Sequence, residues 1–279
     1  MRRMGSVTAP GIAQATYDAA VAAQAAAEAK LVAVGSWVEL ASTITAKCAG
    51  AATSDPDSLA AGLTVTTTTG TFNSETVTCN QFNWTTHAST NDGWSETLNY
   101  DLGTVASLLT GYDPATYGVQ IVADLVAVGT LNGTNPLIAL IIAPSGSAAP
   151  NSPGAGWAIY STTSAAAMWV VSTGNHGSEM TAQDPTSVLA RVQARWLPTG
   201  FANRSHIIAM TAATSTTPSK SLAYDNSGPT FATTDKFLLL IGSNSSTAAA
   251  VSGLKIRFRA RIVPWANLDL SDLDLGCQA

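Results

Sequence analysis

Charged residues are scarce in this chain of 279 residues, at 11% of the total, against roughly 25% in an ordinary globular chain. The 13 basic and 18 acidic side chains leave a net charge of −5, which excludes a general attraction to nucleic acid. Thr, Ser, Ala and Gly take the place of the missing charges. A surface with few charges and many hydroxyl groups is expected for a protein that is part of an assembly or that must resist proteolysis.

Long apolar runs are missing as well. No stretch reaches the ~18 consecutive apolar residues of a membrane-spanning helix, so we expect no membrane insertion. Arg2 and Arg3 resemble the charged start of a signal peptide, but Pro10, Gln14 and Asp18 interrupt the apolar core that should follow. The sequence therefore predicts no signal peptide and synthesis in a cytoplasm.

Cysteine is limited to Cys48, Cys79 and Cys277, which cannot all pair within one chain. Three reduced thiols are expected for a chain made in a cytoplasm. The alternative is a bridge between Cys48 and Cys79 on neighbouring strands.

Recognisable catalytic patterns are also missing. None of His87, His176 and His206 is spaced with another His, Cys or carboxylate as in a metal site. The chain has no Gly-x-Ser-x-Gly nucleophile motif and no phosphate-binding glycine loop. We therefore expect no catalytic residues, no metal and no cofactor, and we predict that the chain is not an enzyme.

A few acidic and aromatic residues leave alternatives open. Glu96, close to Trp94, could line a cleft, but a glycosidase needs two facing carboxylates. The closely spaced aspartates from Asp269 to Asp274 lack the closing Glu of a calcium loop. The seven Trp and six Tyr fit either a sugar-binding surface or ordinary core packing. No glycan-binding residue is predicted.

An alanine-rich stretch near the start, residues 11–34, predicts a helix that ends at Gly35. A heptad seam of small residues includes Ile12, Ala15, Ala19, Ala22 and Ala26. The seam could pack between copies of the chain or against another protein. The alternatives are a helix that lies on its own domain and one that frays in solution. Residues 1–35 are therefore predicted to form an arm and an attachment or oligomerisation helix.

From residue 36 the pattern changes to strands, beginning with an expected strand from Trp37 to Ala46. About a dozen short strands without intervening helices predict an all-β fold, an antiparallel β-sandwich or jelly roll, over residues 36–265. Residues 266–279 form an acidic C-terminal tail. The apolar run from Phe237 to Ile241 and the alternating run from Leu254 to Val263 are the expected closing strands.

Four like charges alternate along the last strand, at Lys255, Arg257, Arg259 and Arg261. Like charges on one strand face repel unless something neutralises them. The face could be solvated, or it could meet an internal partner, the acidic tail or a neighbouring subunit. Nucleic acid is a third reading, which the acidic net charge opposes. These four residues are predicted to form an interface. Phe258, on the other face of the same strand, is expected to point into the core.

An Ala-rich helix followed by a Thr/Ser/Gly/Ala-rich β-sandwich resembles the virion proteins of bacteriophages. The closing strands, Phe237–Ile241 and Leu254–Val263, resemble the last strands of lectin-like jelly rolls in phage fibre and receptor-binding proteins. The resemblance covers roughly residues 10–263. It implies a homotrimer that attaches to other virion proteins by its N-terminal helix, with the sandwich facing outward towards host surface carbohydrate.

The function implied by this resemblance is a non-enzymatic structural component of a phage particle. A tail or head fibre and a capsid decoration protein both fit, and the protein would reside in the virion after synthesis in the host bacterial cytoplasm. Two other function classes stay open: a free carbohydrate-binding module or lectin, and a glycan hydrolase.

Overall fold

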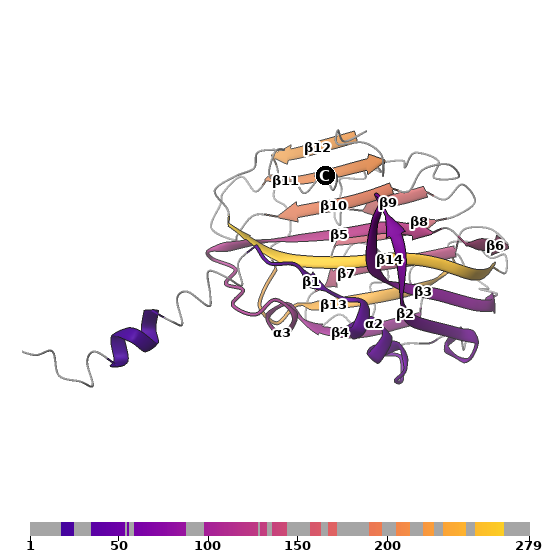
Figure 1. Ribbon diagram of the computed structural model, residues 1–279, viewed down its shortest axis with the longest axis horizontal. Helices are drawn as coiled ribbons and strands as arrows, with labels where there is room; N and C mark the ends of the chain where they lie inside the picture. Colours follow the sequence, from indigo (N-terminus) through magenta and orange to yellow (C-terminus); the bar gives the residue numbers. More distant parts are fainter. Residues whose placement is uncertain are drawn as a thin grey trace, which may run out of the picture.

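The chain folds into two antiparallel sheets that lie face to face (Figure 1). The computed structural model describes residues 18–24, 35–53, 55, 59–87, 98–127, 129–132, 136–143, 157–162, 167–171, 190–196, 205–212, 220–225, 231–243 and 249–264. These residues contain fourteen strands. The all-β sandwich that the sequence predicted is confirmed, while the acidic tail lies outside the described residues.

The larger sheet has nine strands and the smaller has five. The larger runs in the order β12 (Lys220–Asp225), β11 (Ser205–Ala212), β10 (Ala190–Trp196), β5 (Tyr117–Ala127), β14 (Ala249–Pro264), β3 (Glu75–His87) and β2 (Leu63–Phe72). Two short strands, β1 (Val38–Glu39) and β6 (Thr130–Asn132), also pair with β14. The smaller sheet runs β4 (Leu98–Thr104), β13 (Lys236–Ser243), β7 (Pro136–Ala143), β8 (Trp157–Thr162) and β9 (Ala167–Val171).

The core lies between the two sheets, and the alternation of β14 decides which of its side chains enter it. Five inward residues are each at most 2% exposed, namely Leu254, Ile256, Phe258, Ala260 and Ile262. From the opposing sheet, the continuously apolar strand β13 contributes Phe237, Leu239 and Ile241 to the same core. A period of two on one strand and an unbroken apolar run on the other are thus both explained by burial.

The expectation of a strand from Trp37 to Ala46 is wrong beyond its first residues. Only β1 pairs with β14, and the chain then turns into helix α2 (Ala41–Cys48). Thr43, Ile44 and Thr45 are β-branched and favour strands in isolation. Leu40, Ala41 and Ile44 are nevertheless all buried, which is the spacing of one helical face. Tertiary packing therefore overrides local preference here.

A buried amide on β3 holds α2 in place. Nδ2 of Asn80 donates to the carbonyl of Ala41 at 2.9 Å and to the hydroxyl of Thr45 at 3.0 Å. The helix has no side-chain cap at its N-terminus. Contacts from the sheet therefore replace the local capping that would have marked this helix in the sequence.

Replacing Asn80 by Ala is expected to lower the free energy of unfolding by about 1–3 kcal/mol, because two hydrogen bonds to α2 are lost in the interior. Urea unfolding followed by tryptophan fluorescence would measure the loss. The exposed Thr66 of the neighbouring strand is a control, and Thr66→Ala should change stability by no more than ~0.5 kcal/mol. Equal effects at the two positions would contradict this role for Asn80.

The hairpin of β2 and β3 curls across the outer face of the larger sheet (Figure 1). Its tip residues Phe72, Val77 and Cys79 form a small second cluster with Val126 of β5. Gly70 permits this approach, because a Cβ there would lie 2.4 Å from a methyl group of Val126. The larger sheet is therefore a curved layer that is partly covered on its outer side.

A helical segment at residues 18–24 belongs to the predicted Ala-rich helix. All seven of these residues are exposed, including Val21. Short helix α3 (Val105–Leu108) and the 3-10 turn η1 (Leu59–Gly62) complete the helical elements among the described residues. Within those residues, no helix has the length and apolar character that crossing a membrane requires.

Candidate functional site

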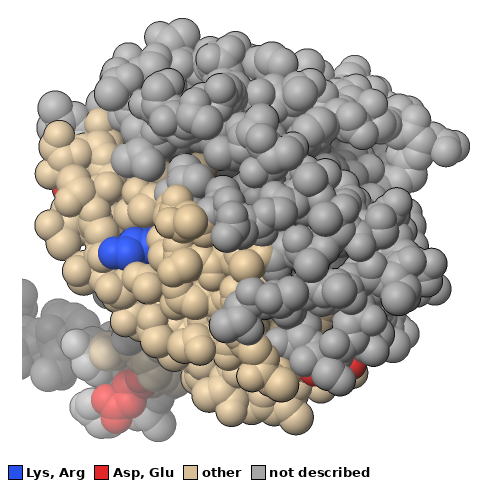
Figure 2. Space-filling model, turned by 90° about the vertical axis from the view of Figure 1, so that its right-hand side faces the viewer, with Lys and Arg blue, Asp and Glu red and all other residues tan. Residues whose placement is uncertain are grey.

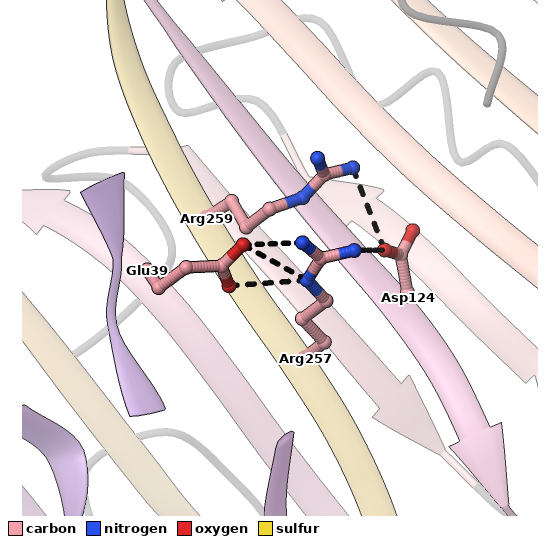
Figure 3. A network of polar contacts seen from close by, with 4 residues as sticks. All are labelled: Glu39, Asp124, Arg257 and Arg259. Carbon is pink, nitrogen blue, oxygen red and sulfur yellow. Dashed lines mark hydrogen bonds and ion pairs between the residues drawn. The ribbon is translucent and has the colours of Figure 1, made fainter. Parts of the chain in front are cut away.

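Two of the four charges in the row on β14 are paired with carboxylates of the same chain (Figure 3). Nε of Arg257 donates to both carboxylate oxygens of Glu39, at 3.0 and 3.2 Å, and its Nη2 also pairs with Glu39. On its other side Nη1 of Arg257 lies 3.8 Å from Oδ2 of Asp124, and Nη2 of Arg259 lies 3.5 Å from the same oxygen. Two carboxylates from β1 and β5 therefore flank two guanidinium groups of β14.

An aromatic ring, a side-chain amide and two backbone carbonyls also contact the row. The guanidinium carbons of Arg259 and Arg261 lie 4.4 and 4.3 Å from the ring centre of Trp37, which is a cation–π arrangement. Nε of Arg261 donates to Oε1 of Gln120 at 2.8 Å, and one of its Nη atoms reaches the Gly35 carbonyl. Nζ of Lys255 donates to the Thr69 carbonyl at 3.0 Å.

This geometry favours the internal-partner reading of the row over a solvated face. Arg259 is only 5% exposed, and Asp124 is fully buried. Sequence reasoning missed Glu39, Asp124 and Trp37, because they lie 133 to 224 residues away along the chain from the arginines they contact. A period of two says nothing about partners on other strands. The predicted interface role of these four basic residues remains a prediction.

A pocket of about 320 Å³ lies in the larger sheet, at the end of β14 opposite to the charged row. It is lined by Gly62, Thr64, Asn83, Trp84, Thr130, Ala250, Val251 and Ser252. Figure 2 looks onto the end of the sandwich where β6 lies in Figure 1, and the described atoms of this face are nearly all uncharged. Sequence reasoning did not predict the pocket, because its walls come from four separate strands.

A β-bulge builds the pocket wall. On β14, Val251 pairs with Trp84 of β3 while Leu254 pairs with Phe82, so Ser252 and Gly253 together oppose only Asn83. The N–H of Gly253 donates to Oδ1 of Asn83 at 2.7 Å, which closes the bulge. The bulge turns Ser252 out of the regular alternation and fixes the orientation of the Asn83 amide.

A glycine lets the next strand approach this bulge. Gly129 has a φ of +69°, and a Cβ there would lie 2.2 Å from the Ser252 carbonyl oxygen. Thr130 then pairs with Ser252 across the β6–β14 ladder. The pocket is therefore assembled from rigid backbone, and its polar side chains sit on strands instead of on long loops.

The described cysteines do not offer a nucleophile or a bridge. Cys48 on α2 and Cys79 on β3 are both free, so the alternative of a bond between them is wrong. Burial raises the pKa of the Cys48 thiol to about 12. Burial also raises the pKa of Cys79, although Lys255 and Arg257 oppose the shift. Both thiols therefore stay protonated at neutral pH, whereas the thiolate is the reactive form.

Most other candidates of the sequence fall outside the site or outside the described residues. Ala19 and Ala22 lie on the exposed helical segment, while Ile12, Ala15 and Ala26 are not described. His176, Glu96, Trp94, the aspartates of the tail and Cys277 also lie outside the described residues. His87 and His206 belong to β3 and β11. The described residues contain no group of three or more His, Cys, Asp or Glu that could hold a metal ion.

Comparison with known proteins finds similarity only at the level of three-dimensional structure. No family model and no curated protein matches the chain. An alginate lyase from Aplysia kurodai is 9% identical with a TM-score of 0.42, over 71% of this chain and 87% of the lyase. An alginate lyase from a Chlorella virus is 10% identical with a TM-score of 0.33, over 83% and 100%. A legume lectin-like domain from Entamoeba histolytica is 11% identical with a TM-score of 0.33, over 73% and 92%.

These structures correct one expectation. The prediction that the chain is not an enzyme is contradicted, because the structures similar to this chain include the two alginate lyases. Missing sequence motifs were insufficient grounds for it, since catalytic groups are assembled across a fold and are recognised by geometry. At this level of similarity the likeness assigns no activity to this chain.

Proposed function

We propose that this chain is a component of a bacteriophage particle, a tail or head fibre or a capsid decoration protein. In this proposal the N-terminal helix attaches the protein to other virion proteins, and the sandwich faces outward to contact glycans on the host surface. The observation that carries the proposal is that all seven helix residues 18–24 are exposed, the apolar Val21 among them. An Ala-rich helix without a packing surface is only marginally stable in water, so a partner is needed to keep it ordered.

The residues at which the sandwich begins support the same separation between an attachment segment and a folded domain. The N–H of Gly35 donates to the Ile262 carbonyl at 2.9 Å, and β1 then joins the edge of β14. Gly35 has a φ of +88°, in a region that favours glycine. From this residue onward the two sheets bury a core of their own, so the segment before it is free to serve attachment.

Removal of residues 1–34 tests the attachment role. The shortened protein should unfold at the same urea concentration as the full chain, because the retained Gly35 keeps its bond to Ile262. Light scattering should show that its self-association is weakened. Mass spectrometry of particles purified from the producing culture should detect the full chain and not the shortened one.

Two results would overturn this proposal. Normal incorporation of the shortened protein into particles would show that the helix is not the attachment element. Failure of the shortened protein to fold would show that the helix is part of the domain. A free lectin or carbohydrate-binding module, in contrast, would bind glycans on an array while staying absent from purified particles.

A further inference from the structure

We propose that the pocket between β2, β3, β6 and β14 binds one uncharged saccharide unit of a glycan. This inference rests on the glycan-contacting part of the proposed function and assigns a site to it. The pocket volume of about 320 Å³ lies at the lower end of the roughly 300–1,000 Å³ typical of small-molecule sites. A single ring with its substituents is a ligand of that size.

The polar groups of the pocket are uncharged, and the hydroxyls among them have no partner within the described residues. Within the described part of the chain, the hydroxyls of Thr64, Thr130 and Ser252 make no hydrogen bond to protein. Asn83 uses its Oδ1 for Gly253 and keeps both hydrogens of Nδ2 available. Hydroxyls donate and accept, as do the hydroxyls of a sugar, so each can pair with a ring substituent in either sense.

The remaining lining is apolar and suits the carbon–hydrogen face of a sugar ring. Trp84, Ala250 and Val251 contribute to it, and the first and last of these also belong to the buried core. Of the described residues that line the pocket, none is charged. An anionic ligand such as a phosphate or a uronate would lack the cation that normally pairs with it, so an uncharged saccharide is the better fit.

The bulge at Ser252 and Gly253 gives the pocket its shape before a ligand arrives. The Asn83 amide is fixed by the 2.7 Å bond from Gly253, and Gly129 brings β6 against the same turn. Such preorganisation lowers the entropic cost of binding. It also places the donors and acceptors where a ligand does not have to reorder the backbone.

The test uses the full chain and ligand-observed NMR with four neutral sugars, D-glucose, D-galactose, D-mannose and N-acetyl-D-glucosamine. Sodium D-galacturonate is the charged comparator. At least one neutral sugar should bind, and Thr64→Trp, which places an indole in the exposed pocket mouth, should weaken that binding at least ~10-fold. Thr66→Trp is the matched control, because Thr66 is exposed on the same strand and does not line the pocket.

A second, smaller substitution keeps the test valid if Thr64→Trp prevents folding. Thr130→Val removes one hydroxyl with little change of shape and should weaken binding by roughly 2–10-fold, the value of one neutral hydrogen bond. Failure of all four sugars to bind would overturn the proposal, as would tighter binding of galacturonate. Sugar binding that neither Thr64→Trp nor Thr130→Val weakens would overturn the assigned site and leave glycan recognition standing. Incorporation of the Thr64→Trp protein into particles should be normal, which separates this test from that of the attachment helix.

Discussion

Replacing Phe258 by Ala is expected to lower the free energy of unfolding by about 3–5 kcal/mol. Phe258 is only 1% exposed and is among the largest fully buried side chains of the protein. It lies on β14, whose pairing with β5 places Phe258 opposite Ala123 at the centre of the larger sheet. Removal of the ring leaves a cavity in the core. The hydrogen bonds between β14 and β5 hold the backbone in place, so the backbone cannot move to fill this cavity.

Urea unfolding would measure this loss as a lower midpoint concentration with an unchanged m-value. Phe258→Leu is the matched control, since it keeps an apolar side chain and most of the volume, and it should cost less than ~1.5 kcal/mol. A loss below about 1 kcal/mol for Phe258→Ala would show that the inward face of β14 is not the tightly packed centre of the core.

The inward face of β14 was predictable from the sequence because burial imposes a local period of two. Every second residue from Leu254 to Ile262 had to be apolar, and each is buried in the structure. The unbroken apolar run of β13 is equally local information. Strand pairing, in contrast, joins residues far apart, and no pattern within Leu254–Val263 could show that β5 and β1 lie on its two sides.

The same limit explains what sequence reasoning missed. Helix α2 is specified by its contact with Asn80, which lies 39 residues after Ala41. The pocket depends on a bulge that exists only when β14 is paired with β3. In the sequence, nothing distinguishes Gly129 and Gly253 from the other glycines of a chain that has 22. Their meaning comes from the positive φ and the close backbone contact that the fold requires at these two positions.

Replacing Arg259 by Ala is expected to lower the free energy of unfolding by roughly 3 kcal/mol, the lower end of the usual effect of removing one partner of a buried ion pair, because Arg257 still lies 3.8 Å from Asp124. From the sequence alone, with this face taken as wet, the same change would cost little. The structure reverses that expectation, because Arg259 is 5% exposed and its partner Asp124 is fully buried. The variant also loses the stacking of the guanidinium on Trp37.

Lys255→Ala is the control, since the Lys255 side chain donates to an exposed carbonyl, and it should cost no more than ~1 kcal/mol. High salt is a further test of burial. In 1 M NaCl the free energy of unfolding lost by Arg259→Ala should be nearly unchanged, because buried ion pairs are weakly screened. In a double-mutant cycle, Asp124→Ala should cost less in the Arg259→Ala background than alone, because one of its two guanidinium partners is already gone while Arg257 stays 3.8 Å away. Additive losses would show that Arg259 acts through its contact with Trp37 and not through its pair with Asp124.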